Sequence, residues 1–201
     1  MSTSPLLEQL ERARTLGLLG PGPAVDHLVH AQGFIDALVD VTGRVVDLGS
    51  GGGVPGLPLA VAREDLEVVL LDASVRRCEF LSSAVASLAL GPRVSVVVGR
   101  AEEIGRGELR GTAGAVIARS FGPPAATAEC AAPLLAVGGR LVVSEPPDAR
   151  DRWPAAGVGL LGLATVGSAT GTPKVQVLEL RRPCPDTYPR RDGVPAKRPL
   201  F

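Results

Sequence analysis

The chain has 201 residues, of which 45% are hydrophobic, and a formal net charge of zero. This length suits one α/β domain with a sizeable core and is too short for two comfortable ones. No apolar run approaches the roughly 18 residues that span a bilayer, and residues 1–5 lack the basic start of a secretory signal, so we expect a cytoplasmic protein without membrane contact.

The three cysteines give no sign of a metal centre or a disulfide framework. Cys78, Cys130 and Cys184 are odd in number, widely spaced and without a CxxC pair. Zinc sites and disulfide scaffolds use close, repeated spacings. We therefore expect ordinary buried or half-buried thiols and no metal.

Two helices are expected before the first strand. Residues 5–19 place leucines at helical spacing, and a short run of glycine and proline ends the pattern. The second helix, over residues 24–38, carries the only histidines, His27 and His30, on one face. Because no further metal ligands are evident, we favour a packing or rim role for both histidines. Residues 1–40 should form an N-terminal helical segment.

Residues 44–60 predict a strand, a tight turn and a helix in succession. Val45, Val46 and Leu48 form a short apolar run that ends in four glycines among five residues, and residues 57–62 resume a helical apolar pattern. Glycines allow positive φ and close approach to a ligand, while the start of a helix offers unpaired N–H groups. The pattern indicates a cradle for a nucleotide-type cofactor.

Two cofactor classes fit this turn. Residues 51–56 match the GxGxxG pattern of dinucleotide-binding proteins, with Asp72 about twenty residues later. Residues 47–53 match DxGxGxG, in which an acid closes the strand, as in class I S-adenosylmethionine-dependent methyltransferases. We favour the second interpretation, because the amino-acid end of S-adenosylmethionine needs polar groups and close backbone approach, which Asp47 and the glycines supply. A turn without a ligand is disfavoured by the entropic cost of so much glycine.

The next strand is expected to end at a ribose-binding carboxylate. Residues 67–72 are apolar and close with Asp72, which is followed by Ala73 and Ser74. A carboxylate at a strand end suits two ribose hydroxyls, and Ser74 is expected to cap a helix over residues 75–89.

Two later strands end at further candidate residues. A strand over 94–98 precedes Ala101 and Glu102, which we take as candidates for contact with adenine. A strand over 115–118 ends at Arg119. Ligands gather at the carboxyl ends of strands in a doubly wound sheet, so Arg119 is the best-placed charged residue for the active site. We favour this role over the alternative, in which Arg119 forms an ion pair on the surface.

The remaining elements complete an α/β fold. A helix is expected over 123–136, a strand over 140–143, and two further strands over about 160–167 and over 174–180. The alternation of residues 174–180 favours an antiparallel strand with one exposed face. Together the elements predict a mostly parallel, seven-stranded sheet with helices on both faces.

The C-terminal tail is basic although the whole chain is neutral. From residue 181 to residue 201 there are six basic and two acidic side chains. Such asymmetry can mark a contact with nucleic acid, for which Arg190, Arg191 and Lys197 are the candidates, and a solvated strap is the equal alternative. The expected organisation is a helical segment over 1–40, a cofactor-binding domain over 41–184 and a basic tail over 185–201.

Several motifs, taken in order, resemble one known family. They are residues 47–60 with the sequence DLGSGGGVPGLPLA, residues 71–81, residues 100–103, residues 116–121, and the tail YPRRDGVPAKRPL over residues 188–200. This set is similar to the bacterial 16S rRNA guanine-N7 methyltransferases, the RsmG or GidB family, and covers roughly residues 25–201. The resemblance implies the class I methyltransferase (Rossmann-like) fold and S-adenosyl-L-methionine as cofactor.

The resemblance also implies a site and a reaction. Gly49, Val54, Ala101, Glu102 and Arg119 match the family's cofactor contacts. Together with the residues chosen from the pattern, the candidate cofactor-binding set is Asp47, Gly49, Ser50, Gly51, Val54, Asp72, Ala73, Ala101, Glu102 and Arg119. The implied reaction is methyl transfer to N7 of a guanine in 16S rRNA. The implied partner is 16S rRNA or the small ribosomal subunit. Because guanine N7 has a free lone pair, no general base is required, and Arg119 is expected to orient cofactor or guanine.

Two segments depart from the family's pattern. The N-terminal helical region is short, with His30 where the family has an aspartate, and residues 143–147 read VSEPP where the family often has lysine-glycine. These differences leave open a methyltransferase that acts on another acceptor, or a non-catalytic binding module. The dinucleotide interpretation of residues 51–56 adds a nicotinamide-dependent oxidoreductase as a third alternative.

Overall fold

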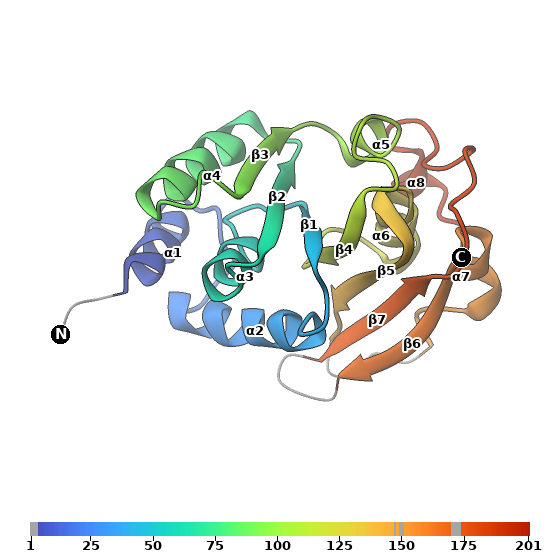
Figure 1. Ribbon diagram of the computed structural model, residues 1–201, viewed down its shortest axis with the longest axis horizontal. Helices are drawn as coiled ribbons and strands as arrows, with labels where there is room; N and C mark the ends of the chain where they lie inside the picture. Colours follow the sequence, from blue (N-terminus) through green and yellow to red (C-terminus); the bar gives the residue numbers. More distant parts are fainter. Residues whose placement is uncertain (1–3, 147, 149–150, 170–173) are drawn as a thin grey trace.

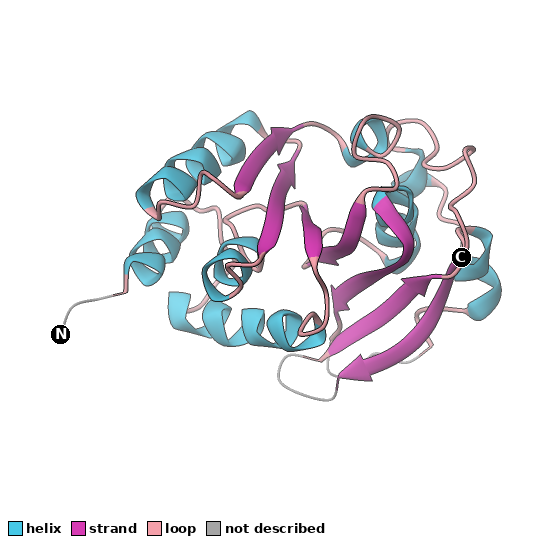
Figure 2. Cartoon of the chain, viewed as in Figure 1, coloured by secondary structure: helices cyan, strands magenta, loops and turns pink. Residues whose placement is uncertain are grey.

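A seven-stranded sheet with helices on both faces forms the body of the molecule (Figures 1 and 2). The computed structural model describes residues 4–146, 148, 151–169 and 174–201. Residues 1–3 and 147, which the sequence analysis also used, lie outside that part. The strands are β1 (Gly43–Leu48), β2 (Leu66–Asp72), β3 (Val94–Val98), β4 (Ala113–Ala118), β5 (Leu135–Ser144), β6 (Leu163–Ala169) and β7 (Val175–Leu180).

Eight α-helices occur among the described residues. They are α1 (Pro5–Thr15), α2 (Ala24–Ala37), α3 (Gly56–Ala62), α4 (Val75–Ser87), α5 (Ala101–Ile104), α6 (Pro124–Ala131), α7 (Ala155–Leu160) and α8 (Val194–Lys197). In the part of the chain that the structure covers, none is long and apolar enough to cross a membrane.

The strand order is β3-β2-β1-β4-β5-β7-β6. The first five strands in this order run parallel, while β7 is antiparallel to both of its neighbours. The predicted mostly parallel sheet and its antiparallel strand over residues 174–180 are confirmed. Chain order reverses between β1 and β4, so this point of the carboxyl edge is where an open α/β sheet accepts a ligand.

Alternate residues of the central strands enter two separate cores. Val45 of β1 is buried with residues of α1, α2, α3 and α4 on one face of the sheet. Its neighbour Val46 is buried with residues of α5, α6 and α7 on the other face. Successive side chains of a strand point to opposite faces, so a strand covered on both sides is apolar throughout, as β4 is.

The first helix is shorter than predicted. It ends at Thr15 and not at residue 19, because Gly17 has φ of 69° and the N–H of Leu18 donates to the carbonyl of Ala13 at 2.9 Å. A left-handed glycine with this backward hydrogen bond terminates a helix. Leu18, expected on the helix, therefore lies in the connection to α2.

The helix predicted over 123–136 is also too long. α6 ends at Ala131, a 3₁₀ turn covers Ala132–Leu134, and β5 already begins at Leu135. Pro133 has no N–H to continue the α-helical ladder. The strand predicted over 140–143 is therefore longer at both ends.

Two helices, α7 and α8, were not predicted, and the sixth strand begins later than predicted. α7 ends at Leu160, and β6 starts only at Leu163. A Cβ on Gly157 of α7 would meet the ring of Phe201, so a contact with the end of the chain fixes this helix. Local periodicity gives no warning of such a contact.

Candidate active site

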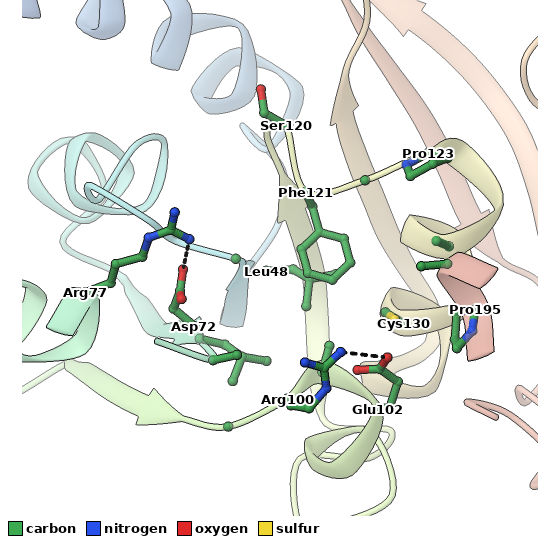
Figure 3. A pocket seen from close by; sticks show the side chains of 18 residues that line it. Leu48, Asp72, Arg77, Arg100, Glu102, Ser120, Phe121, Pro123, Cys130 and Pro195 are labelled. Atoms are coloured by element: carbon green, nitrogen blue, oxygen red, sulfur yellow. Dashed lines mark hydrogen bonds and ion pairs between the residues drawn. The ribbon is translucent and has the colours of Figure 1, made fainter. Parts of the chain in front are cut away.

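A cavity of about 330 Å³ opens at the carboxyl ends of β1, β2 and β4. Figure 3 shows the ring of Phe121 between Asp72 and Arg77 on one side and Cys130 and Pro195 on the other. Gly49, Asp72, Ala73, Ala101 and Glu102, all predicted to bind the cofactor, line this cavity. The cavity thus joins apolar walls to two carboxylates.

The glycine turn is fastened to the end of β2. The N–H groups of Gly49 and Ser50 donate to the carbonyl of Leu71 at 2.8 and 3.0 Å. The N–H of Gly51 donates to Oδ2 of Asp72 at 2.9 Å. Gly49 and Gly51 have φ of 74° and 54°, which a residue with a side chain adopts only with strain.

The glycines of this turn make room for the protein itself. A Cβ on Gly49 would lie 2.6 Å from the Phe121 ring, and a Cβ on Gly52 would lie 2.7 Å from Leu19 and 2.8 Å from the carbonyl of Leu18. The glycine pattern predicted close approach of a ligand. For Gly52 the close neighbour is instead the connection between α1 and α2.

Asp47 lies beneath the turn and does not line the cavity. It is 1% exposed, and its Oδ2 accepts the N–H of Gly56 at 3.0 Å. No described residue donates to its Oδ1. Burial raises the pKa of Asp47 to about 7, despite the hydrogen bond from Gly56. Asp47 therefore supports the start of α3.

Asp72 joins the turn, the next helix and the cavity. Its Oδ2 accepts from Gly51, and its Oδ1 accepts the N–H of Ser74 at 2.9 Å. Arg77 forms an ion pair with Oδ2 at 3.5 Å. Ser74 occupies the N-cap of α4, but its side chain makes no capping hydrogen bond, so that prediction is wrong. The carboxylate of Asp72 takes the local N–H instead.

Glu102 is held at the opposite end of the cavity. It is buried, and its Oε1 accepts the N–H of Gly193 at 2.9 Å, with Arg100 at 3.6 Å. Cys130 lies close by, and burial raises the pKa of its thiol to about 12. The thiol stays protonated at neutral pH and serves as an apolar wall.

Two other predicted cofactor residues point away from the cavity. The hydroxyl of Ser50 is buried and donates to the carbonyl of Asp47 at 2.9 Å. Val54 is buried in the core that contains α1 and α2. The side chains of Ser50 and Val54 support the turn on the side that faces the protein interior. Any contact of these residues with a ligand in the cavity would therefore be made by their backbone atoms.

Arg119 and His27 form a pair beside the cavity. Nη2 of Arg119 donates to Nδ1 of His27 at 2.6 Å, and Nε2 of the histidine donates to the carbonyl of Gly20 at 3.3 Å. Burial, and then the Arg119 charge, lower the pKa of His27, so the ring is neutral at pH 7. Burial also lowers the pKa of Arg119. Nη1 of Arg119 is buried without a partner among the described residues.

Arg119 lines a second cavity, of about 430 Å³, and not the first. This cavity also contains His30 and Glu145, and it shares Ser120, Phe121 and Gly122 with the first. Glu145 accepts from Nε1 of Trp153 and from Arg152, both at 2.8 Å. Glu145, the acidic residue in the segment that departs from the family's pattern, is thus hydrogen-bonded within the protein. No cluster suited to a metal ion occurs in the described part of the chain.

The three basic tail residues differ in their surroundings. Arg190 is paired with Glu129 at 2.6 Å, so its guanidinium is engaged within the protein. Arg191 and Lys197 are exposed. Of the three candidates for substrate binding, these two are the ones free to meet a phosphate.

Several residues that line the first cavity were not predicted from the sequence. Among them are Arg77, Phe121, Pro195 and Ala196. Arg77 and Phe121 stand in the quoted motifs and follow strand ends, a signal that could have identified them. Pro195 and Ala196 reach the cavity only through tertiary folding, and no local pattern indicates them.

Comparisons with known proteins agree on one class. The family described as "GidB: rRNA small subunit methyltransferase G" matches residues 25–153. "Ribosomal RNA small subunit methyltransferase G" of Moorella thermoacetica is 35% identical over 177 residues, covering 83% of this chain and 73% of that protein. The protein of the same name from Deinococcus radiodurans is 36% identical over 185 residues, covering 84% and 73%.

Solved structures with low identity share the fold. The O-methyltransferase TomG from Streptomyces achromogenes, in complex with SAM, has a TM-score of 0.62 at 18% identity and covers 90% of this chain and 92% of its own. A 16S rRNA (adenine(1408)-N(1))-methyltransferase has a TM-score of 0.56 at 16% identity and covers 77% and 93%. These similarities show the class I methyltransferase fold alone.

Proposed function

The chain belongs to the rRNA small subunit methyltransferase G family, and we propose that it transfers a methyl group from S-adenosylmethionine to N7 of a guanine in 16S rRNA. Membership of this family removes support for the dinucleotide interpretation of residues 51–56. The acceptor is free 16S rRNA or the small ribosomal subunit, and we place the activity in the cytoplasm, where the subunit is available.

The first cavity has the chemistry that S-adenosylmethionine requires. Asp72 and Glu102 offer carboxylate oxygens for hydroxyl and amine groups, while Leu48, Leu71 and Phe121 offer apolar surface for a planar base. Asp72 is fixed by two backbone N–H groups, so its position is set before a ligand arrives. We assign it to the ribose, as the strand-end position suggests.

The second cavity is the place for the acceptor base. It adjoins the first through Ser120, Phe121 and Gly122, and this adjacency is the observation that carries the proposal. Arg119 lines this cavity, and its Nη1 has no partner among the described residues. Guanine presents the acceptors O6 and N7 side by side, so a donor to O6 would orient N7.

Transfer to N7 needs positioning more than proton transfer. The cofactor supplies a methyl group activated by the sulfonium charge. N7 has a free lone pair, so no side chain has to remove a proton before attack. Arg119 therefore orients and does not act as an acid or base, and neutral His27 fixes the guanidinium by accepting its N–H.

The test is methylation of small ribosomal subunits that lack the modification. We expect the wild-type protein to place label from S-adenosylmethionine on N7 of a single guanine. Arg119→Ala should lower kcat/KM about 100-fold or more, because the acceptor loses its alignment. Arg44→Ala is the matched control, since Arg44 pairs with Glu67 on the surface.

The outcomes separate the alternatives left open by the sequence. Label on another atom or another molecule would identify a different acceptor. Cofactor binding without any transfer to rRNA or subunits would contradict the proposed reaction and favour a binding module. Equal activity of Arg119→Ala and Arg44→Ala would remove Arg119 from the site.

A further inference from the structure

Residues 185–201, which we call the C-terminal strap, fold back over the sheet edge. In Figure 1 the strap passes beside α5 and α6 before the chain ends. Pro195 and Ala196, on α8 and within the strap, line the first cavity together with Asp72 and Glu102. The strap therefore supplies one wall of the cavity that the strands open.

Two arginines outside the strap donate hydrogen bonds to its backbone carbonyl groups. Arg110 donates to the carbonyl of Tyr188 at 2.8 Å and to the carbonyl of Pro185 at 3.2 Å. Arg106 donates to the carbonyl of Arg190 at 2.7 Å and to that of Pro189 at 3.2 Å. These bonds fix the path of the main chain, which a loosely solvated tail would not show.

An ion pair between the half-buried Arg190 and a fully buried carboxylate attaches the strap to α6. Glu129 is fully buried, and its two oxygens accept Nε and Nη2 of Arg190 at 2.8 and 2.6 Å. The N–H of Arg190 also donates to Glu129 at 2.8 Å. Removing one partner of a buried charge pair leaves the other uncompensated, so this contact holds the strap in one place.

One strap residue touches the cavity's own carboxylate. The N–H of Gly193 donates to Oε1 of Glu102, and Asp192 lies 3.5 Å from Arg100, which also faces Glu102. No described residue donates to the other oxygen, Oε2. The strap thus fixes Glu102 with one oxygen committed and the other free for a ligand.

From these contacts we propose that the C-terminal strap is part of the cofactor-binding site. Pro195 and Ala196 form the wall against which S-adenosylmethionine or S-adenosylhomocysteine packs, and Gly193 positions Glu102 toward it. This inference rests on the proposed function for the identity of the ligand. It assigns to the basic tail a role distinct from phosphate contact, which its exposed Arg191, Lys197 and Arg198 are free to add.

The test compares two neighbouring exposed residues. Ala196 lines the cavity and Lys197 does not, and a large side chain at either exposed position leaves the core untouched. Calorimetric titration of the full chain with S-adenosylhomocysteine should show a Kd at least tenfold higher for Ala196→Trp than for the wild type. Lys197→Trp should stay within twofold of it.

Other outcomes have distinct meanings. Wild-type affinity in Ala196→Trp, or an equal loss in both variants, would overturn the role of the strap. Failure of the wild-type chain to bind S-adenosylhomocysteine would instead contradict the cofactor assignment of the proposed function.

A second measurement needs no variant. S-adenosylhomocysteine should slow amide hydrogen exchange in peptides that cover residues 190–198, while exchange in α7 stays unchanged. A strap that served only to stabilise the fold would show no difference between the free and bound protein, and that result would also overturn the proposal.

Discussion

Asp47 shows how a single residue can combine a structural task with a free-energy cost. Its carboxylate is enclosed, yet among the residues that the structure describes only Gly56 donates to it, from its N–H to Oδ2. Burial raises its pKa to about 7, whereas an unfolded chain leaves an aspartate near its ordinary value. The folded protein therefore binds a proton here that the unfolded chain has already released.

The raised pKa of Asp47 predicts a pH-dependent stability. Its contribution to the free energy of unfolding is fully present below about pH 4 and falls as pH rises to about 7, because the native state binds more protons in that window. A pKa that rises from about 4 to about 7 on folding corresponds to roughly 4 kcal/mol of unfolding free energy. Urea denaturation at pH 5 and pH 8 should show about 2–3 kcal/mol of this loss in the wild type and its absence in Asp47→Asn.

Asp65→Asn serves as the control for this experiment. Asp65 is exposed, and its hydrogen bond from Arg63 lowers its pKa to about 2. Its contribution to stability is therefore lost only as pH falls below about 4, and Asp65→Asn should keep the wild-type loss between pH 5 and pH 8. A pH dependence in Asp47→Asn as steep as that of the wild type would contradict the raised pKa.

The glycine turn depends, at the scale of elements, on segments that come before and after it. The connection between α1 and α2 reaches Gly52 through Leu18 and Leu19, and the loop after β4 reaches Gly49 through Phe121. The turn is therefore clamped by the protein itself. Its shape at the cavity depends on the N-terminal segment as much as on its own residues.

Gly52→Ala should distort this contact. The added methyl group would meet Leu19 and the carbonyl of Leu18 well inside normal separations, so we expect a loss of about 1–3 kcal/mol in unfolding free energy. Affinity for S-adenosylhomocysteine should fall with it. Chemical denaturation and calorimetry measure the two effects.

Gly91→Ala is the matched control, since nothing lies within 4 Å of its added methyl group. Its stability should differ from that of the wild type by less than about 1 kcal/mol. Equal stability of the two variants would refute the clamping of the turn by the N-terminal connection.

The whole molecule has two cores that share one sheet. Leu10 and Phe34, from the N-terminal helices, are fully buried on one face, and Tyr188 and Phe201, from the C-terminal strap, pack on the other. These contacts bring together the three segments expected from the sequence. The division into residues 1–40, 41–184 and 185–201 remains a prediction that unfolding can test.

We expect the chain to unfold in one cooperative transition. Trp153, the only tryptophan, is buried and bonded to Glu145, so its fluorescence reports on the second core, while far-UV circular dichroism reports on all helices. The two signals should follow coincident denaturation curves. Separate transitions, or a stable fold after deletion of residues 1–40, would show that the N-terminal segment is an independent unit.

The sequence by itself determined the seven strands in chain order, the mostly parallel sheet with one antiparallel strand, and the glycine turn between β1 and α3. It also identified Gly49, Asp72, Ala73, Ala101 and Glu102, which the structure brings to one cavity. All of these follow from local information. Strand and helix periods show in short windows, and residues at the carboxyl ends of parallel strands meet at one edge of the sheet.

Only the tertiary structure decided how distant segments complete the site. Arg119 meets His27 across 92 positions of the chain, and Gly193 meets Glu102 across 91. Such contacts arise from the packing of helices against the sheet, which hydrophobic pattern constrains only loosely. For the same reason the sequence indicated a basic tail, whereas folding committed Arg190 to Glu129 and brought Pro195 to the cavity wall.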